Sequence, residues 1–142
     1  MQRLKSTRVL AMAVFASGIF DLIGGFYYAI LVGIGRSIES PPTHPFYAIL
    51  VGSFLFCLAY LQLLSAVNIR RYLLIVGAVI MSRVLYAVLL FAYMFSVPDF
   101  PTTFLPTAVL DLAWTATYIV LVLMIDQLRL RDLFVPHKGD RV

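Results

Sequence analysis

Two ionisable residues of opposite charge lie inside long apolar stretches of this chain. Arg83 is near the midpoint of the stretch 72–95, and Asp21 is near the midpoint of the stretch 9–34. An ionised side chain in hydrocarbon costs at least about 2.5–3.5 kcal/mol, so charges at this depth need a partner inside the protein. We therefore expect Arg83 and Asp21 to form a buried ion pair that holds a helical bundle together.

Asp111 is the second candidate partner for Arg83. It lies in the apolar stretch 104–125, about 8 Å from the depth of Arg83 if each residue rises about 1.5 Å along its helix. An arginine side chain is long enough to lean over that distance. The pair can be purely structural, or it can line a polar cavity that binds a charged group, and the sequence leaves both interpretations open.

Aromatic side chains fall beside these charges. Residues three or four positions apart share one face of a helix, and in the stretch 46–67 this spacing gives a stripe of Ser53, Cys57, Tyr60 and Leu64. Deep tyrosines need a hydrogen-bond partner, which an Arg–Asp pair can supply, although packing and interfacial anchoring also explain them. The predicted candidate cavity is lined by Asp21, Tyr60, Arg83, Tyr86, Asp111, Trp114 and Tyr118.

The elements that must position these side chains are four apolar stretches. They cover about residues 9–34, 46–67, 72–95 and 104–125, and each reaches the roughly 20 residues that a membrane-crossing helix needs. Of the whole chain 62% is hydrophobic and 13% is charged, whereas soluble domains average roughly 25% charged residues. We therefore expect an all-α, polytopic membrane protein: four transmembrane helices in one antiparallel bundle over residues 1–135.

The distribution of basic residues predicts the orientation of the bundle. Lys and Arg concentrate before the first stretch, between the second and third, and after the fourth, whereas the opposite side carries Arg36. Such residues favour the cytoplasmic side, so we expect both termini in the cytoplasm and the chain in the cell membrane. The basic residues then face anionic headgroups, which explains the pI of about 9.5 without a nucleic-acid partner.

The two ends of the chain and its remaining reactive side chains suggest no further chemistry. Residues 126–135 are expected as the frayed end of the last helix at the membrane interface, with a helix that docks on a partner as the alternative. Residues 136–142 are expected as a disordered tail. No HExxH, CxxC or Walker pattern occurs. His44 and His137 fall on opposite sides of the predicted membrane, so we expect neither a metal site nor a cofactor.

The middle third of the chain resembles the small DoxX-like membrane proteins. The similarity lies in 45–60 and 68–86, where a Pro-led helix with Gly52 meets the short basic turn Asn68-Ile69-Arg70-Arg71, and the next helix carries Arg83. The resemblance implies a fold of four membrane spans and little about activity.

Two functions are compatible with these features. The first is a non-enzymatic subunit or accessory protein that packs against other membrane helices or against its own copies, with lipids as its remaining partners. The alternative is a membrane enzyme or transporter that binds a lipid or small molecule in the Arg/Asp/Tyr cavity. A filled bundle centre favours the first function, and a cavity of about 300 Å³ or more at Arg83 favours the second.

Overall fold

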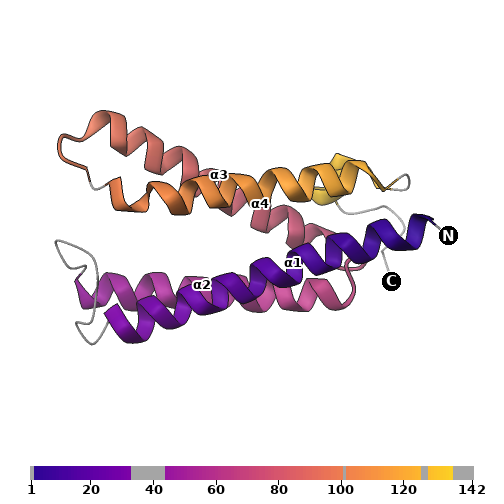
Figure 1. Cartoon of the computed structure of the whole chain (residues 1–142), viewed down its shortest axis with the longest axis horizontal. Helices are drawn as coiled ribbons and strands as arrows, with labels where there is room; N and C mark the ends of the chain where they lie inside the picture. The colour runs from indigo at the N-terminus through magenta and orange to yellow at the C-terminus, as the bar shows by residue number, and fades with distance from the viewer. Residues whose placement is uncertain (1, 33–43, 101, 126–127, 136–142) are drawn as a thin grey trace.

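The computed structural model describes residues 2–32, 44–100, 102–125 and 128–135, and long helices dominate them (Figure 1). The long helices are α1 (Gln2–Phe26), α2 (Pro45–Val67), α3 (Leu73–Ser96) and α4 (Leu105–Leu123). Three shorter elements accompany them: the π-helix η1 (Tyr27–Val32), which continues α1, and the 3₁₀ turns η2 (Thr102–Phe104) and η3 (Leu130–Leu133). None of the described residues forms a strand, so the all-α prediction is confirmed.

Four segments are long and apolar enough to cross a membrane: Thr7–Val32, Pro45–Val67, Leu73–Ser96 and Leu105–Leu123. These bounds agree with the predicted stretches to within a few residues. In no span is more than 44% of the most apolar window buried inside the molecule. Most of the apolar surface of each span therefore faces away from the bundle.

The helix starts follow from local chemistry. Pro45 and Pro106 each stand in the first turn of a helix, α2 and α4 respectively, where a missing backbone N–H removes no helical hydrogen bond. The Nδ1 atom of His44 accepts a hydrogen bond at 3.2 Å from the backbone N–H of Phe46 and so caps α2. His44 is thus explained by helix capping.

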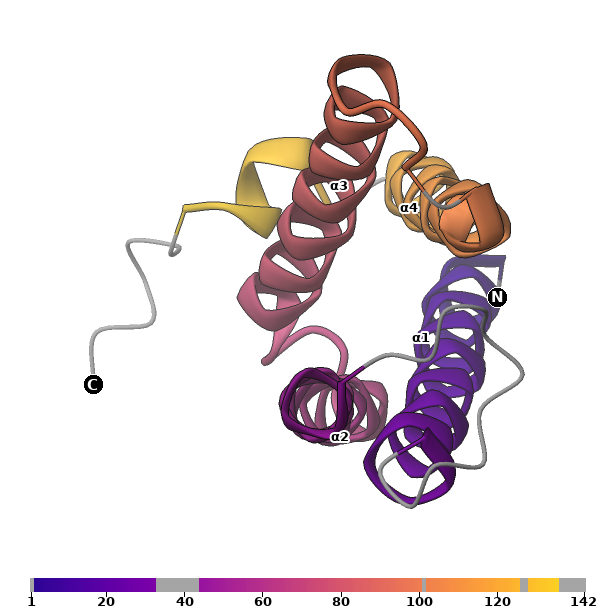
Figure 2. The same ribbon diagram turned by 90° about the vertical axis from the view of Figure 1, so that its left-hand side faces the viewer.

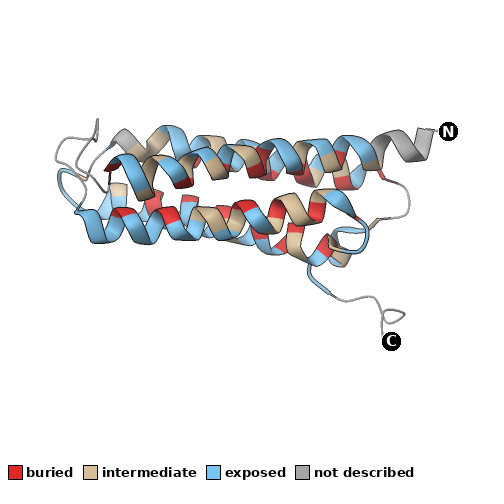
Figure 3. Ribbon diagram, turned by 90° about the horizontal axis from the view of Figure 1, so that it is seen from below, coloured by how far each residue is buried: buried red, intermediate tan, exposed pale blue. Residues whose placement is uncertain are grey.

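The four helices surround a common centre in the order of the chain, so that α4 lies beside α1 (Figure 2). Buried residues follow the inward faces of the helices, and exposed residues cover the outside (Figure 3). The amino terminus of α1, the α2–α3 turn and η3 lie at one end of the bundle (Figure 1). We call this end the basic end, because its exposed arginines are Arg8, Arg70, Arg71, Arg129 and Arg131.

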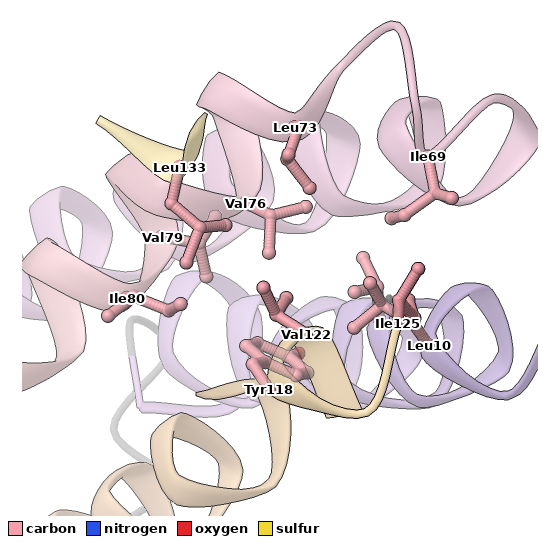
Figure 4. Close-up of a cluster of buried hydrophobic side chains, with 11 residues drawn as sticks. Leu10, Ile69, Leu73, Val76, Val79, Ile80, Tyr118, Val122, Ile125 and Leu133 are labelled. Carbon is pink, nitrogen blue, oxygen red and sulfur yellow. The ribbon is translucent and has the colours of Figure 1, made fainter. Parts of the chain in front are cut away.

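A hydrophobic core fills the half of the bundle next to the basic end (Figure 4). It joins α1, α3, α4, the α2–α3 turn and η3 through Leu10, Val14, Ile69, Leu73, Val76, Val79, Ile80, Tyr118, Val122, Ile125 and Leu133. Leu58 and Ala66 of α2 pack against this core. One continuous apolar cluster therefore connects every element at this end.

The segment that follows α4 packs onto α3, and the prediction of a frayed helix end is wrong there. Leu133 of η3 is 1% exposed and lies in the core beside Val76 and Val79 (Figure 4). Its backbone carbonyl lies so close to Gly77 that a Cβ atom at that position would overlap it. Glycine at position 77 leaves room for this segment. The burial of Leu133 against α3 therefore takes the place of an extension of α4. Residues 126–127 and the predicted disordered tail 136–142 lie outside the described residues.

At the opposite end the helices pack in pairs. In the first pair, a Cβ atom added to Gly52 of α2 would lie 2.6 Å from the backbone nitrogen of Ala29 in η1. In the second pair, Ala87 and Leu90 of α3 and Ala108 of α4 form a small buried cluster. Small residues thus bring α1 close to α2 and α3 close to α4.

Candidate functional site

A network of polar side chains surrounds Arg83 at the middle of the bundle. The Nη2 group of Arg83 donates hydrogen bonds to Oδ2 of Asp21 at 2.7 Å and to Oγ of Ser17 at 2.8 Å. Arg83 and Asp21 are each 3% exposed, and Ser17 is fully buried. The Arg83–Asp21 contact expected from the sequence is therefore present between α3 and α1.

Asp111 of α4 also pairs with Arg83, through a hydrogen bond from the Nη1 group of the guanidinium to Oδ1. The sequence ranked Asp21 and Asp111 as alternative partners, whereas the structure uses both. The guanidinium allows this because it is planar and its nitrogens carry separate donors that point in different directions. One residue of α3 thereby connects α1 with α4.

Gln62 of α2 completes the network and was missed in the sequence. Its Nε2 group donates to Oδ2 of Asp21 at 2.5 Å, and its Oε1 accepts from Ser17 at 2.5 Å. The hydroxyl of Tyr118 donates to the same Oε1 at 3.3 Å. The available signal was the amide itself, because an amide inside a long apolar stretch needs a partner in the protein.

The predicted polar stripe of α2 faces outward, so this prediction is wrong. Ser53 and Cys57 are exposed, and Tyr60 is 65% exposed. The face of α2 that turns inward carries Ala48, Gly52, Ala59, Gln62 and Ser65. The small residues of this face turn inward because they let α2 approach α1 closely. The predicted stripe contains Tyr60, whose large side chain would hold the two helices apart.

The other predicted aromatic residues occupy different surroundings. Tyr118 is fully buried within the network, and its ring lies 6.3 Å from that of Trp114. Tyr86 is 37% exposed, and its hydroxyl is 2.8 Å from Oγ1 of Thr107 on α4. Of the predicted tyrosines, Tyr118 alone hydrogen-bonds within the Arg83 network, and Tyr60 points away from it.

No protein-family model matches this sequence, and comparisons with curated proteins and with solved structures give no significant match.

The chemistry of the network is hydrogen bonding and charge pairing. Among the described residues, no group of three or more His, Cys, Asp and Glu side chains is arranged to hold a metal ion. The carboxylates and the guanidinium are mostly occupied by one another and by Ser17 and Gln62. Such a network specifies which helix faces meet, because its hydrogen bonds form in only one arrangement of the helices. Among the described residues, the Nε atom of Arg83 has no hydrogen-bond partner.

Proposed function

We propose that this protein is an integral protein of the cell membrane that crosses the bilayer four times, with both termini in the cytoplasm. It works as a non-enzymatic subunit or accessory protein that packs against other membrane helices, including those of its own copies. Membrane lipids cover the remaining surface. The resemblance of the middle of the chain to DoxX-like proteins is compatible with this proposal.

The contrast between the bundle centre and its outside carries the proposal. The central polar groups hydrogen-bond to one another across all four helices, and all of them are buried except Asp111, whose side chain is 19% exposed. The outward faces carry large exposed apolar side chains on every helix, such as Phe15, Phe54, Leu85 and Val109. In a membrane such faces meet either lipid tails or other apolar helices. The centre thus holds the bundle, and the outside is available for partners.

Charge at the two ends supports the proposed orientation. The basic end carries five exposed arginines in the described residues, named above, and Arg71 also stacks on the ring of Tyr72 at 5.6 Å. At the opposite end, the exposed charged residue that the structure describes is Asp99. Cytoplasmic segments of membrane proteins are enriched in Lys and Arg, so the basic end faces the cytoplasm.

Cysteine cross-linking in native membranes tests the packing function. Cys57 is the single cysteine and is exposed on α2. In a Cys57→Ser background, Phe15→Cys, Leu85→Cys and Val109→Cys place a thiol on the outward face of α1, α3 and α4. The unchanged protein, with Cys57, tests the outward face of α2. We expect a short bismaleimide to link at least one of these four positions to a neighbouring chain. Ala59→Cys, whose position is fully buried, is the control that should not react. Absence of linked products from all four faces would contradict the proposal.

Labelling in intact cells tests the orientation. In the Cys57→Ser background we expect an impermeant maleimide to label Asp99→Cys directly, but Arg70→Cys only after lysis. The reverse pattern would contradict cytoplasmic termini. It would not bear on the packing function, which the cross-linking tests separately.

A further inference from the structure

Element η3 lies outside the ring formed by the four long helices. It packs beside α3 (Figure 2), where Leu133 is buried and its backbone carbonyl lies against Gly77. Gly77 is four residues after Leu73, the first residue of α3, so η3 contacts this helix about 6 Å from its end. In the proposed membrane location, this depth is the boundary between lipid headgroups and acyl chains. The part of η3 that does not contact the protein therefore has lipid as its neighbour.

Internal hydrogen bonds fix the shape of η3. The backbone N–H of Arg129 donates to Oδ2 of Asp132 at 2.8 Å, and the backbone N–H of Asp132 donates to the carbonyl of Arg129, also at 2.8 Å. The backbone N–H of Phe134 donates to the carbonyl of Arg131 at 3.0 Å. A segment that satisfies its own backbone groups is suited to lie beside lipid, where water is scarce. Element η3 therefore presents its side chains in a fixed arrangement.

The exposed side chains of η3 and of the two residues after it include large apolar groups. Leu130 is 39% exposed, Phe134 is 49% exposed and Val135 is 58% exposed. None of them belongs to a membrane-spanning segment, so the lipid-facing side of a span does not account for their exposure. Exposed apolar side chains next to basic ones are typical of segments that lie at a membrane surface.

The arginines of this segment lack matching carboxylates. Arg129 and Arg131 are both exposed, and the Nε atom of Arg131 lies 3.6 Å from Oδ1 of Asp132. Among the described residues of the basic end, Asp132 is the one carboxylate beside the five arginines named above. Guanidinium groups in excess of carboxylates favour an anionic partner, and their planar donors match the oxygens of a phosphate group.

We propose that η3 is a binding surface for an anionic phospholipid, whose phosphate contacts Arg129 and Arg131 and whose acyl chains cover the apolar side chains beside them. An anionic lipid fits better than a zwitterionic one, because an amine or choline group would bring positive charge back toward the arginines. The proposal rests on the membrane location in the proposed function and names the lipid class that this end binds. A lipid that binds only the docked form of η3 also stabilises that form.

Lipid binding by the purified full-length protein in a mild uncharged detergent tests the proposal. Dioctanoyl phosphatidylglycerol is titrated and its binding followed by native mass spectrometry. Dioctanoyl phosphatidylcholine, which has the same acyl chains and no net charge, is the comparison lipid. We expect saturable binding of phosphatidylglycerol with an affinity at least about tenfold higher than that of phosphatidylcholine. Equal affinities would show adsorption through the acyl chains only and overturn the proposal.

Paired arginine variants test the position of the site. The double variant Arg129→Gln, Arg131→Gln should bind phosphatidylglycerol at least about tenfold more weakly than the unchanged protein. The control Arg8→Gln, Arg70→Gln removes the same charge from other elements of the basic end, and its affinity should change by about twofold or less. Equal losses in the two double variants would show diffuse attraction to the whole end and overturn the proposal.

A glycine variant tests the docked geometry with every arginine in place. In Gly77→Ala the new Cβ would overlap the backbone of Leu133, so η3 is displaced and the affinity for phosphatidylglycerol should fall as in the double variant of η3. Gly24→Ala, where the nearest new contact is Leu55 of α2, should bind as the unchanged protein does. Unaltered affinity in Gly77→Ala would show that the docked arrangement is not needed and overturn the proposal.

The results separate the lipid site from the packing function. Saturable phosphatidylglycerol binding without cross-linked products would support the lipid site and count against the packing function only. Cross-linked products without saturable phosphatidylglycerol binding would overturn the lipid site only. Displacement of phosphatidylglycerol by hexaglutamate at comparable concentrations would assign the arginines to an acidic protein partner and overturn the proposal.

Discussion

The two halves of the bundle are held together in different ways. In the half next to the basic end, one apolar cluster connects α1, α3, α4, the α2–α3 turn and η3, with α2 packed against it. In the opposite half, each helix packs tightly on one partner, α1 on α2 and α3 on α4. The Arg83 network lies between these halves and joins side chains of all four helices by hydrogen bonds.

This difference shows what the buried charges contribute. In the proposed membrane location, apolar contacts between helices are hardly better than apolar contacts with lipid, so they specify partners weakly. At the basic end the specificity comes from the shape of a large cluster that includes the docked segment η3. At the Arg83 network, between the two halves, the specificity of helix packing comes from hydrogen bonds that only one arrangement of the helices satisfies. Among the described residues of the opposite half, neither device joins the α1–α2 pair to the α3–α4 pair.

Among the changes that test this difference between the halves, removal of the Arg83 guanidinium should destabilise the bundle most. Arg83→Leu leaves the buried Asp21 and the partly buried Asp111 without a counter-charge, which should cost about 3–5 kcal/mol and separate the two halves. The expected results are low expression and a large decrease in the thermal unfolding temperature in detergent.

The matched control for Arg83→Leu removes the carboxylates as well. The triple variant Arg83→Leu, Asp21→Leu, Asp111→Leu has no unpaired charge and should recover most of the lost stability. A triple variant as unstable as the single one would show that the charges contribute through something other than pairing.

The glycine below η3 tests the half next to the basic end. In Gly77→Ala the new Cβ meets the backbone of Leu133, so η3 must leave α3. Exposure of Leu133 should cost about 1.5–3 kcal/mol, and trypsin should cleave faster after the exposed Arg129 and Arg131. Gly24→Ala is the control, since its nearest new contact is the flexible end of Leu55 at 3.3 Å. Cleavage of Gly77→Ala at the original rate would contradict this docking.

The glycine between α1 and α2 tests the opposite half. In Gly52→Ala the new Cβ meets backbone and side-chain atoms of Ala29, at 2.6–2.9 Å, so the two helices must separate locally. Such overpacking should cost about 1–3 kcal/mol. Hydrogen exchange should increase in η1 and the first turns of α2, while the segment around η3 keeps its protection. Equal increases at both ends would contradict the independence of the two halves.

The smallest expected change in stability concerns Tyr60 and Tyr118, which the sequence analysis both assigned to the candidate cavity. Tyr118→Phe removes a buried hydroxyl that donates to Gln62 and should cost about 0.5–1.5 kcal/mol. Tyr60→Phe changes an exposed side chain and should lie within about 0.5 kcal/mol of the unchanged protein. Thermal unfolding of the two variants side by side measures the difference, and the reverse order would contradict the observed orientation of α2.

The sequence by itself determined the number, the type and nearly the bounds of the long helices. Uninterrupted apolar stretches have few alternatives to a helix, because a helix satisfies its own backbone hydrogen bonds. Pro45, Pro106 and the basic turn before α3 mark the ends of these stretches. The sequence also predicted the contact between Arg83 and Asp21, because each lies in an apolar stretch where an unpaired charge is costly.

The tertiary structure decided which face of each helix turns inward. A span that is apolar on every side gives no direction from hydrophobicity, so the outward position of Tyr60 and the inward position of Gln62 depend on the close approach of α2 to α1 at Gly52. The use of Asp111 together with Asp21 depends on where α4 lies. The docking of Leu133 against Gly77 depends on a space that exists only once α3 and η3 are in contact. These features arise from distances between elements, which the order of residues along one chain does not contain.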